Sequence, residues 1–223
     1  MVANAEAESG TTPTMAFRKR LTGIVGAVAL AGALAFSAGA SAQTSPWQQS
    51  FTHEAAGRYA EAAAALEPVL RDKPNHEFAL LRRAWLNYLQ GRHNEAIRDY
   101  NQALTLNFKS LDARHGVTLP LMAQQRWTEA ALEARKAINA GTDWDYTGHL
   151  HLMISEEGAR KWEDLAEHAA QASLRYPGDA TFLVYQARAH AWMANVARAK
   201  AVYGQVLERV PAHIEALEYI KTH

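Results

Sequence analysis

Histidine is the residue of this chain with the widest range of chemistry, and it occurs 10 times in 223 residues. His149 and His151 lie two positions apart, and on a helix that spacing points two side chains in different directions, so they cannot easily share a metal ion. Nothing in the spacing of His53, His115 and His190 indicates that they converge on a metal. We interpret the histidines as scattered solvated or core side chains, and we predict no metal site.

Glu156 and Glu157 are the one carboxylate pair that resembles an acid–base site. Adjacent helical residues point about 100° apart, so the pair is poorly arranged for acid–base chemistry and is expected on a solvated helix face. The chain has no cysteine, which excludes disulfides, zinc–thiolate sites and thiol nucleophiles. It also has no P-loop, dinucleotide fingerprint, zinc-protease motif or nucleophile elbow. We therefore predict no catalytic residue, no cofactor and no enzymatic activity.

The charge balance argues against nucleic acid and anionic membranes as partners. The chain has 23 basic and 23 acidic residues, and residues 43–223 retain 20 basic and 21 acidic ones. A near-neutral balance leaves no electrostatic footprint for nucleic acid or for an anionic membrane.

The elements that position any functional residue follow from a repeat of about 34 residues. A small or apolar residue recurs in steps of 34, 34, 35 and 34, at Ala62, Ala96, Ala130, Leu165 and Ala199. A second position keeps the same step, at Tyr59, His93, Trp127, Trp162 and Val196. A third position, often proline, closes each unit at Pro74, Phe108, Thr142, Pro177 and Pro211. This period predicts stacked two-helix units, each of which needs its neighbours to bury its apolar face.

These residues resemble the tetratricopeptide repeat (TPR) family, over residues 43–213. The second unit matches best, through Ala79, Leu80, Ala84, Tyr88, Gly91, Glu95-Ala96-Ile97, Tyr100 and Ala103-Leu104. It departs at Arg83, where the family usually has leucine, and at Phe108, where it usually has proline. The resemblance implies an all-α, right-handed superhelical solenoid of about five two-helix units with a C-terminal capping helix.

Local signals predict where helices begin and turn. Competent N-caps stand where the first helices of the units begin, at Ser45, Asn75, Ser110, Asp145 and Asp179. The turn inside each unit calls for a left-handed residue, at Gly57, Gly91, Gln125 and Ala194.

Two irregularities interrupt the pattern in the third and fourth units. The one extra residue between Ala130 and Leu165 is predicted in the loop at 141–145. Pro120 falls inside a predicted helix, where it removes a hydrogen bond and clashes with the carbonyl group of Gly116, so a kink is expected.

The resemblance also implies a concave groove lined by the first helices of the units. Helix register places fourteen residues on this groove, including Phe78, Leu89, Leu119 and Ile154. The ten predicted to form the binding site are Trp47, Phe51, Arg82, Trp85, His115, Met122, His151, Tyr185, Arg188 and Trp192. Aromatic and arginine side chains are common anchors of binding surfaces. Of the ten, Arg82, Arg188 and Trp192 are expected to be exposed, whereas Trp85, like the neighbouring Phe78, is expected in the core.

The groove is expected to hold a peptide or a partner protein. Some TPR domains clamp a C-terminal carboxylate with lysine, arginine and asparagine residues. Trp47 and Phe51 open this face instead, which disfavours that clamp and favours an apolar or proline-rich segment.

The N-terminus predicts export. Basic residues at 18–20, an uncharged run from Leu21 to Phe36 and the small residues Ala40 and Ala42 together form a secretory signal. We expect a signal peptide at 1–42, with Met15 a possible true start, cleavage between Ala42 and Gln43, and a TPR domain at 43–223. The mature protein would then be periplasmic or secreted. The alternative is an uncleaved segment that anchors the chain to the inner membrane, and membrane contact is expected only in that case.

These patterns lead to one main hypothesis and one rival. The main hypothesis is an exported bacterial scaffold for protein–protein interaction that binds a peptide or partner protein in its groove and acts in envelope assembly. The rival is a hydrolase or metal-binding protein that uses the histidine and glutamate residues of the third and fourth units.

Overall fold

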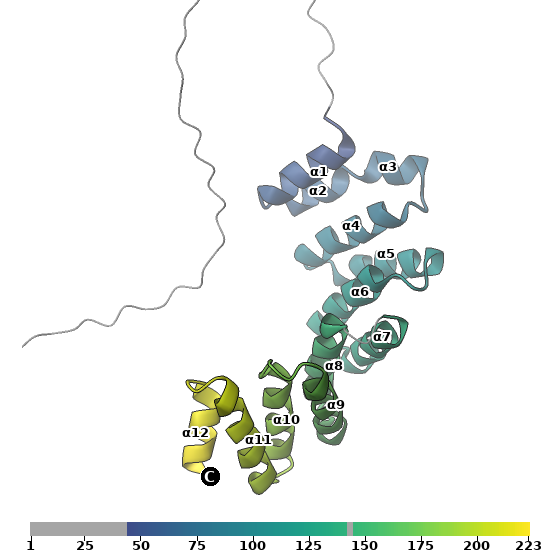
Figure 1. Cartoon of the computed structure of the whole chain (residues 1–223). Coiled ribbons are helices and arrows are strands. Elements are labelled where there is room, and N and C mark those ends of the chain that lie inside the picture. Colours follow the sequence, from purple (N-terminus) through teal and green to yellow (C-terminus); the bar gives the residue numbers. More distant parts are fainter. Residues whose placement is uncertain (1–43, 142–144) are drawn as a thin grey trace, which may run out of the picture. The chain divides into compact units, whose positions relative to one another are not determined.

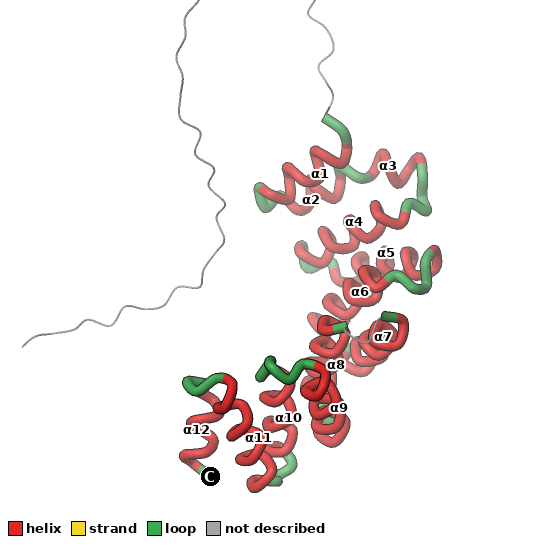
Figure 2. Tube along the Cα trace, in the orientation of Figure 1, coloured by secondary structure: helices red, strands yellow, loops and turns green. Residues whose placement is uncertain are grey.

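The computed structural model describes residues 44–141 and 145–223 (Figure 1). Within these ranges every regular element is a helix, as Figure 2 shows, which confirms the all-α prediction. None of the helices described is both long and apolar enough to span a membrane. The predicted signal peptide, its cleavage site and the possible start at Met15 lie outside the described residues.

In the described ranges the helices form five successive units followed by a single helix, with three helices in the first unit and two in each of the others. They are α1 (Pro46–Ala55), α2 (Tyr59–Ala64) and α3 (Glu67–Asp72); α4 (Glu77–Leu89) and α5 (His93–Leu106); α6 (Leu111–Ala123) and α7 (Trp127–Ala140); α8 (Tyr146–Gly158) and α9 (Trp162–Arg175); α10 (Thr181–Trp192) and α11 (Val196–Arg209); and α12 (Ile214–Thr222). Each first helix packs on its own second helix and on the second helix of the unit before it (Figure 1). The described part of the chain is therefore a solenoid of five units that each consist of a first and a second helix, and α12 covers the last pair.

The recurring small residue lies where the two helices of a unit cross. Ala62, Ala96, Ala130 and Ala199 have no exposed surface, and neither has Leu165, which replaces alanine in the fourth unit. An alanine at the crossing lets the two backbones approach closely, and the buried residues of the stacked helices that the structure describes form five clusters along the solenoid.

The second helix of the first unit is broken, which the repeat pattern did not predict. It consists of α2 and α3, with Ala65 and Leu66 in a turn between them. The cause is Pro68 near the start of α3. Proline has no N–H group to donate to the carbonyl of Ala64, and its ring would clash with that carbonyl.

The turns inside the units adopt the left-handed backbone that the sequence predicts. Gly57 and Gly91 have φ of 72° and 74°, and Gln125 and Ala194 have φ of 57° and 58°. Arg160 occupies the same place in the fourth unit with a φ of 56°. Side chains at three of the five turns therefore adopt a conformation that favours glycine.

Most of the predicted caps are also present. The Ser45 side chain accepts from the N–H of Gln48 in a capping box, and Ser110 and Asp145 cap α6 and α8. Asn75 is a wrong prediction, because it lies in the turn and the next residue, His76, is the cap of α4. The His76 Nδ1 atom accepts from a backbone N–H group and takes the role of the serine or aspartate oxygen.

The extra residue of the repeat falls between α7 and α8, where 142–144 lie outside the described residues. The ends of α5 and α7, Leu106 and Ala140, are 34 residues apart, whereas the starts of α6 and α8, Leu111 and Tyr146, are 35 apart. The insertion therefore falls between Ala140 and Tyr146, and the helices on both sides keep their lengths.

Helix α6 continues through Pro120 to Ala123, so the proline does not end it. The kink at Pro120 stays a prediction. Four residues earlier, Gly116 packs against Tyr100 of α5, and a Cβ atom there would overlap the tyrosine ring. Gly116 thus permits a close approach of α5 and α6.

Arg83 departs from the leucine that is typical of the repeat because it forms an ion pair inside its unit. Its Nε and Nη2 atoms donate to the two carboxylate oxygens of Asp99 at 2.7 and 2.8 Å. Asp99 on α5 is only 1% exposed, and Asn87 also donates to it at 3.4 Å. A bidentate pair therefore holds α4 to α5 where most repeats use an apolar contact.

Candidate binding surface

The first helices α1, α4, α6, α8 and α10 form one continuous face, here called the first-helix surface. Helix α4 contacts α6, α6 contacts α8, and α8 contacts α10. Helix α1 joins the series through a hydrogen bond of 2.8 Å from Arg82 of α4 to Ser50. This is the face on which the sequence placed its ten candidate residues.

A cavity of about 280 Å³ lies at the N-terminal end of the first-helix surface. Its lining residues are Phe51, Phe78, Leu81, Arg82, Trp85, Tyr100 and Asp112. Three of its aromatic side chains are well exposed: Phe51 by 50%, Phe78 by 52% and Trp85 by 36%.

The expectation of core positions for Phe78 and Trp85 is therefore wrong. These two residues are seven apart on α4 and lie beside the stripe that the helix buries, which contains Ala79, Leu80 and Leu86. A seven-residue spacing returns to the same side of a helix, so both rings face the cavity.

Arg82 was expected to be exposed, and this is wrong, because the residue is buried and only 8% exposed. Its Nη1 atom lies 2.8 Å from Glu54 Oε2, and its Nε atom donates to Ser50 Oγ. Its Cζ atom lies 3.5 Å from the centre of the Phe51 ring. Glu54 also accepts from the indole N–H of Trp85 at 2.9 Å. Helix α1 thus covers the guanidinium group and supplies its partners.

The middle of the first-helix surface contains two histidines, His115 and His151, whose ring nitrogen atoms contact other side chains of the protein. His115 Nε2 lies 2.9 Å from Asp145 Oδ1, and the Thr118 hydroxyl lies 2.5 Å from Nδ1 of His151. Burial, with a smaller contribution from nearby His115, lowers the pKa of His151 to about 4. Met122 is partly buried against the core of the second and third units. These contacts indicate structural roles for the three candidates.

Trp47, the first of the ten candidates, also packs within the fold. Its ring centre lies 5.4 Å from those of His76 and Phe78, and it packs against the core of the first two units.

Glu156 was expected on a solvated face, and this is wrong. It has no exposed surface and lies between Arg135 and His168, at 2.6 and 2.8 Å. Glu157 points elsewhere and lies 3.5 Å from Arg188 of α10. Among the residues that the structure describes, no group of three or more histidine and acidic side chains is arranged to hold a metal ion.

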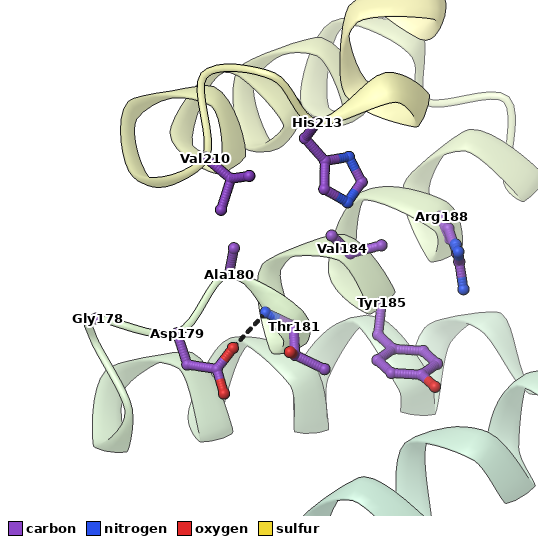
Figure 3. Close-up of a pocket in the computed structure, with 9 residues that line it drawn as sticks. All are labelled: Gly178, Asp179, Ala180, Thr181, Val184, Tyr185, Arg188, Val210 and His213. Carbon is purple, nitrogen blue, oxygen red and sulfur yellow. Dashed lines mark hydrogen bonds between the residues drawn. The ribbon is translucent and has the colours of Figure 1, made fainter. Parts of the chain in front are cut away.

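The C-terminal end of the surface contains a cavity of about 560 Å³ between α10 and the loop that precedes α12 (Figure 3). Tyr185 and Arg188 line it from α10, with Val210 and His213 on the facing segment. At the start of α10 the predicted cap is displaced by one residue, because the N-cap is Ala180. The side chain of Asp179 nevertheless accepts from the N–H of Thr181 at 2.8 Å, the dashed line in Figure 3.

A second cavity of about 640 Å³ lies between α10 and α12, here called the α10–α12 cavity. Its lining residues are Glu157, Arg188, Ala191, Trp192, Tyr203, Glu215, Glu218, Tyr219, Thr222 and His223. Trp192 is 68% exposed, as predicted, and stacks on Trp162 with ring centres 5.3 Å apart.

Arg188 is half-exposed but already paired. Its Nε and Nη2 atoms donate to Glu215 at 2.8 and 2.7 Å, and Tyr203 donates to the same carboxylate at 2.6 Å. The hydrogen bonds from Arg188, together with the one from Tyr203, lower the pKa of Glu215 despite partial burial. The arginine therefore serves to hold α12 on α10, a role that the sequence analysis missed because the partner lies in the capping helix.

Comparisons with known proteins agree with this fold. Models of the tetratricopeptide repeat match residues 77–110 and 182–213. Among solved structures, MamA from Desulfovibrio magneticus is 16% identical, with 74% of this chain and 93% of that chain covered and a TM-score of 0.65. YrrB, described as a TPR protein with an unusual peptide-binding site, is 14% identical, with coverage of 77% and 88% and a TM-score of 0.66.

A thermophilic TPR protein from Thermus thermophilus is 18% identical, with coverage of 79% and 96% and a TM-score of 0.52. No curated protein matches the chain significantly by sequence. The two matched repeats correspond to α4–α5 and α10–α11, and the same two-helix unit continues between them. The chain therefore contains tetratricopeptide repeats.

Proposed function

We propose that this protein is an exported scaffold that binds a peptide segment of a partner protein along the first-helix surface. The TPR fold supports a role in protein–protein interaction. The observation that carries the finer proposal is the exposure of large aromatic side chains beside cavities at both ends of this one surface. Phe51, Phe78 and Trp85 lie at one end, and Trp192 lies at the other.

Exposed aromatic side chains of this kind favour binding to another chain. Each presents a large rigid apolar area whose burial requires little loss of side-chain entropy, which is why tryptophan and other aromatic residues are common binding anchors. YrrB, which shares the fold, is described as having a peptide-binding site. An extended segment or a helix with spaced apolar side chains fits a row of such positions.

Site-specific crosslinking tests the surface. A photoreactive benzoylphenylalanine replaces Phe78 or Trp192, and the control replaces Leu174, which is 82% exposed on the second helix α9. Because all three positions are exposed, the fold tolerates each replacement. We expect crosslinks to the same partner from Phe78 and Trp192 and none from Leu174. Crosslinks from Leu174 alone would move the binding site to the second helices and contradict the proposal.

Export and a role in envelope assembly belong to the same proposal. They rest on the basic, apolar and small-residue pattern of residues 18–42. N-terminal sequencing of protein recovered from the cell envelope is the direct test. A mature N-terminus at Gln43 supports a periplasmic or secreted protein, whereas recovery of Leu21 to Ala42 would identify an inner-membrane anchor.

A further inference from the structure

We propose that the α10–α12 cavity binds a lysine or arginine side chain of the partner peptide. This inference rests on the proposed function and adds the chemical class of one contact. The cavity combines the exposed side chain of Trp192 with three carboxylates against one guanidinium group, which is the environment that a cation on an apolar stem prefers.

The charges of the cavity favour a cation. Its lining contains the carboxylates of Glu157, Glu215 and Glu218 against the single guanidinium of Arg188, so the lining side chains carry a formal charge of −2 with His223 neutral. Arg188 is bound in bidentate fashion to Glu215, which also accepts from Tyr203. The cation present is therefore largely used to balance one carboxylate, and two carboxylates remain.

The remaining carboxylates have few partners. Glu157 lies 3.5 Å from Arg188, a long contact for an ion pair. Burial raises the pKa of Glu157 against the opposing effect of Arg188, so its ionised form is incompletely stabilised in the free protein. Glu218 is exposed and forms no ion pair with any residue in the described ranges. A bound cation would give the carboxylates of Glu157 and Glu218 an ion-pair partner.

The aromatic wall favours a side chain over a free ion. Trp192 stacks on Trp162 with an angle of 7° between the ring planes, so one face of the exposed indole is covered. The Trp192 indole also lines the cavity, together with Tyr219 of α12, whose ring stacks on that of His223 with ring centres 4.2 Å apart. An indole face attracts ammonium and guanidinium groups, and the methylene groups of lysine or arginine gain apolar contact with the same rings.

Capped tripeptides with a central lysine, arginine, glutamine or glutamate are suitable probes. Titration into the full chain is followed by NMR on the indole N–H signal of Trp192. We expect the lysine and arginine peptides to shift this signal, and the glutamine peptide to bind about tenfold more weakly because it lacks the charge. The glutamate peptide should give no saturable shift, and added salt should weaken lysine binding.

Variants then assign the effect to the cavity. Glu218→Gln and Trp192→Ala alter exposed side chains and should leave the fold intact, yet each should weaken lysine-peptide binding by about fivefold or more. Because Trp192→Ala lacks the indole, its titration is followed on the backbone N–H signal of Tyr219, which also lines the cavity. Glu61→Gln, an exposed glutamate on α2 in the first unit, is the matched control and should bind like the parent. Equal binding of the lysine and glutamine peptides, or unchanged binding in Glu218→Gln, would overturn the inference.

The test separates this inference from the function on which it rests. If Phe78 and Trp192 crosslink to a partner but no peptide shifts the Trp192 signal in a charge-dependent way, the binding surface stands and the cation site fails. If lysine-dependent binding is present but the partner crosslinks only from the second helices, the proposed function fails instead.

Discussion

The same substitution, glycine to alanine, should change stability in opposite directions at two positions of this solenoid. Gly91 lies in the turn between α4 and α5 with a φ of 74°, whereas Gly204 lies inside helix α11. A Cβ atom added at either position would meet no heavy atom within 4 Å outside its immediate surroundings in the chain. Neither substitution creates a clash, so each reports on backbone conformation alone.

The expected magnitudes follow from the two backbone conformations. A left-handed conformation costs an L-residue about 1–2 kcal/mol, and replacing glycine recovers part of this, about 0.4–1 kcal/mol, by restricting the unfolded chain. Gly91→Ala should therefore lower the free energy of unfolding by about 1 kcal/mol. In a helix interior alanine is favoured over glycine, so Gly204→Ala should raise it by about 0.5–1 kcal/mol.

Urea unfolding followed by circular dichroism measures both variants against the parent. Comparable slopes are required, because repeat proteins can lose cooperativity and a changed slope would alter the meaning of the midpoint. Ala194→Gly is the reverse experiment, since Ala194 is exposed with a φ of 58°, and it should stabilise the protein by about 0.5–1 kcal/mol. A Gly91→Ala variant as stable as the parent, or a Gly204→Ala variant less stable than the parent, would refute the assignment of strain to the turn.

Three further perturbations test the core. The pKa of His151 is lowered from 6.5 to about 4, so as the pH falls the unfolded chain takes up a proton before the folded chain does. The free energy of unfolding is therefore fully present above pH 6.5 and should decline by roughly 3 kcal/mol towards pH 4. Urea unfolding at a series of pH values measures this decline, and His151→Gln should reduce it. Ala96→Leu should cost about 1–3 kcal/mol by forcing α4 and α5 apart, whereas Ala60→Leu at an exposed position should change the melting temperature little. Asp99→Asn should cost about 2–4 kcal/mol by leaving Arg83 without its bidentate partner, and adding Arg83→Leu should restore part of that loss in a double-mutant cycle.

The sequence alone was sufficient for the architecture, because the features that specify it are local or strictly periodic. The small residue at each helix crossing, the left-handed turn residue and the extra residue at 141–145 each leave a mark at a fixed step along the chain. Pro68 was an equally local signal for the break between α2 and α3, although a repeat pattern read for its regularity passes over it.

The burial of some polar residues could also have been predicted by comparing equivalent positions in successive units. Arg82, Gly116 and His151 are equivalent positions in successive units, and all three are buried. Glu156 is equivalent to Leu121, which is buried as well. A polar residue at a position that is apolar in another unit predicts a buried ion pair, and this comparison between units would have corrected two of the expectations.

Only the tertiary structure decided which side chains are free to bind a partner. Helical register states the direction of a side chain relative to its own axis, whereas exposure depends on what the neighbouring helix places in front of it. Ser50 and Glu54 of α1 make Arg82 a buried side chain, and Glu215 of α12 engages Arg188. These partners come from other units, so no window on one helix contains them, and the exposed aromatic side chains beside the cavities became apparent only once the helices were stacked.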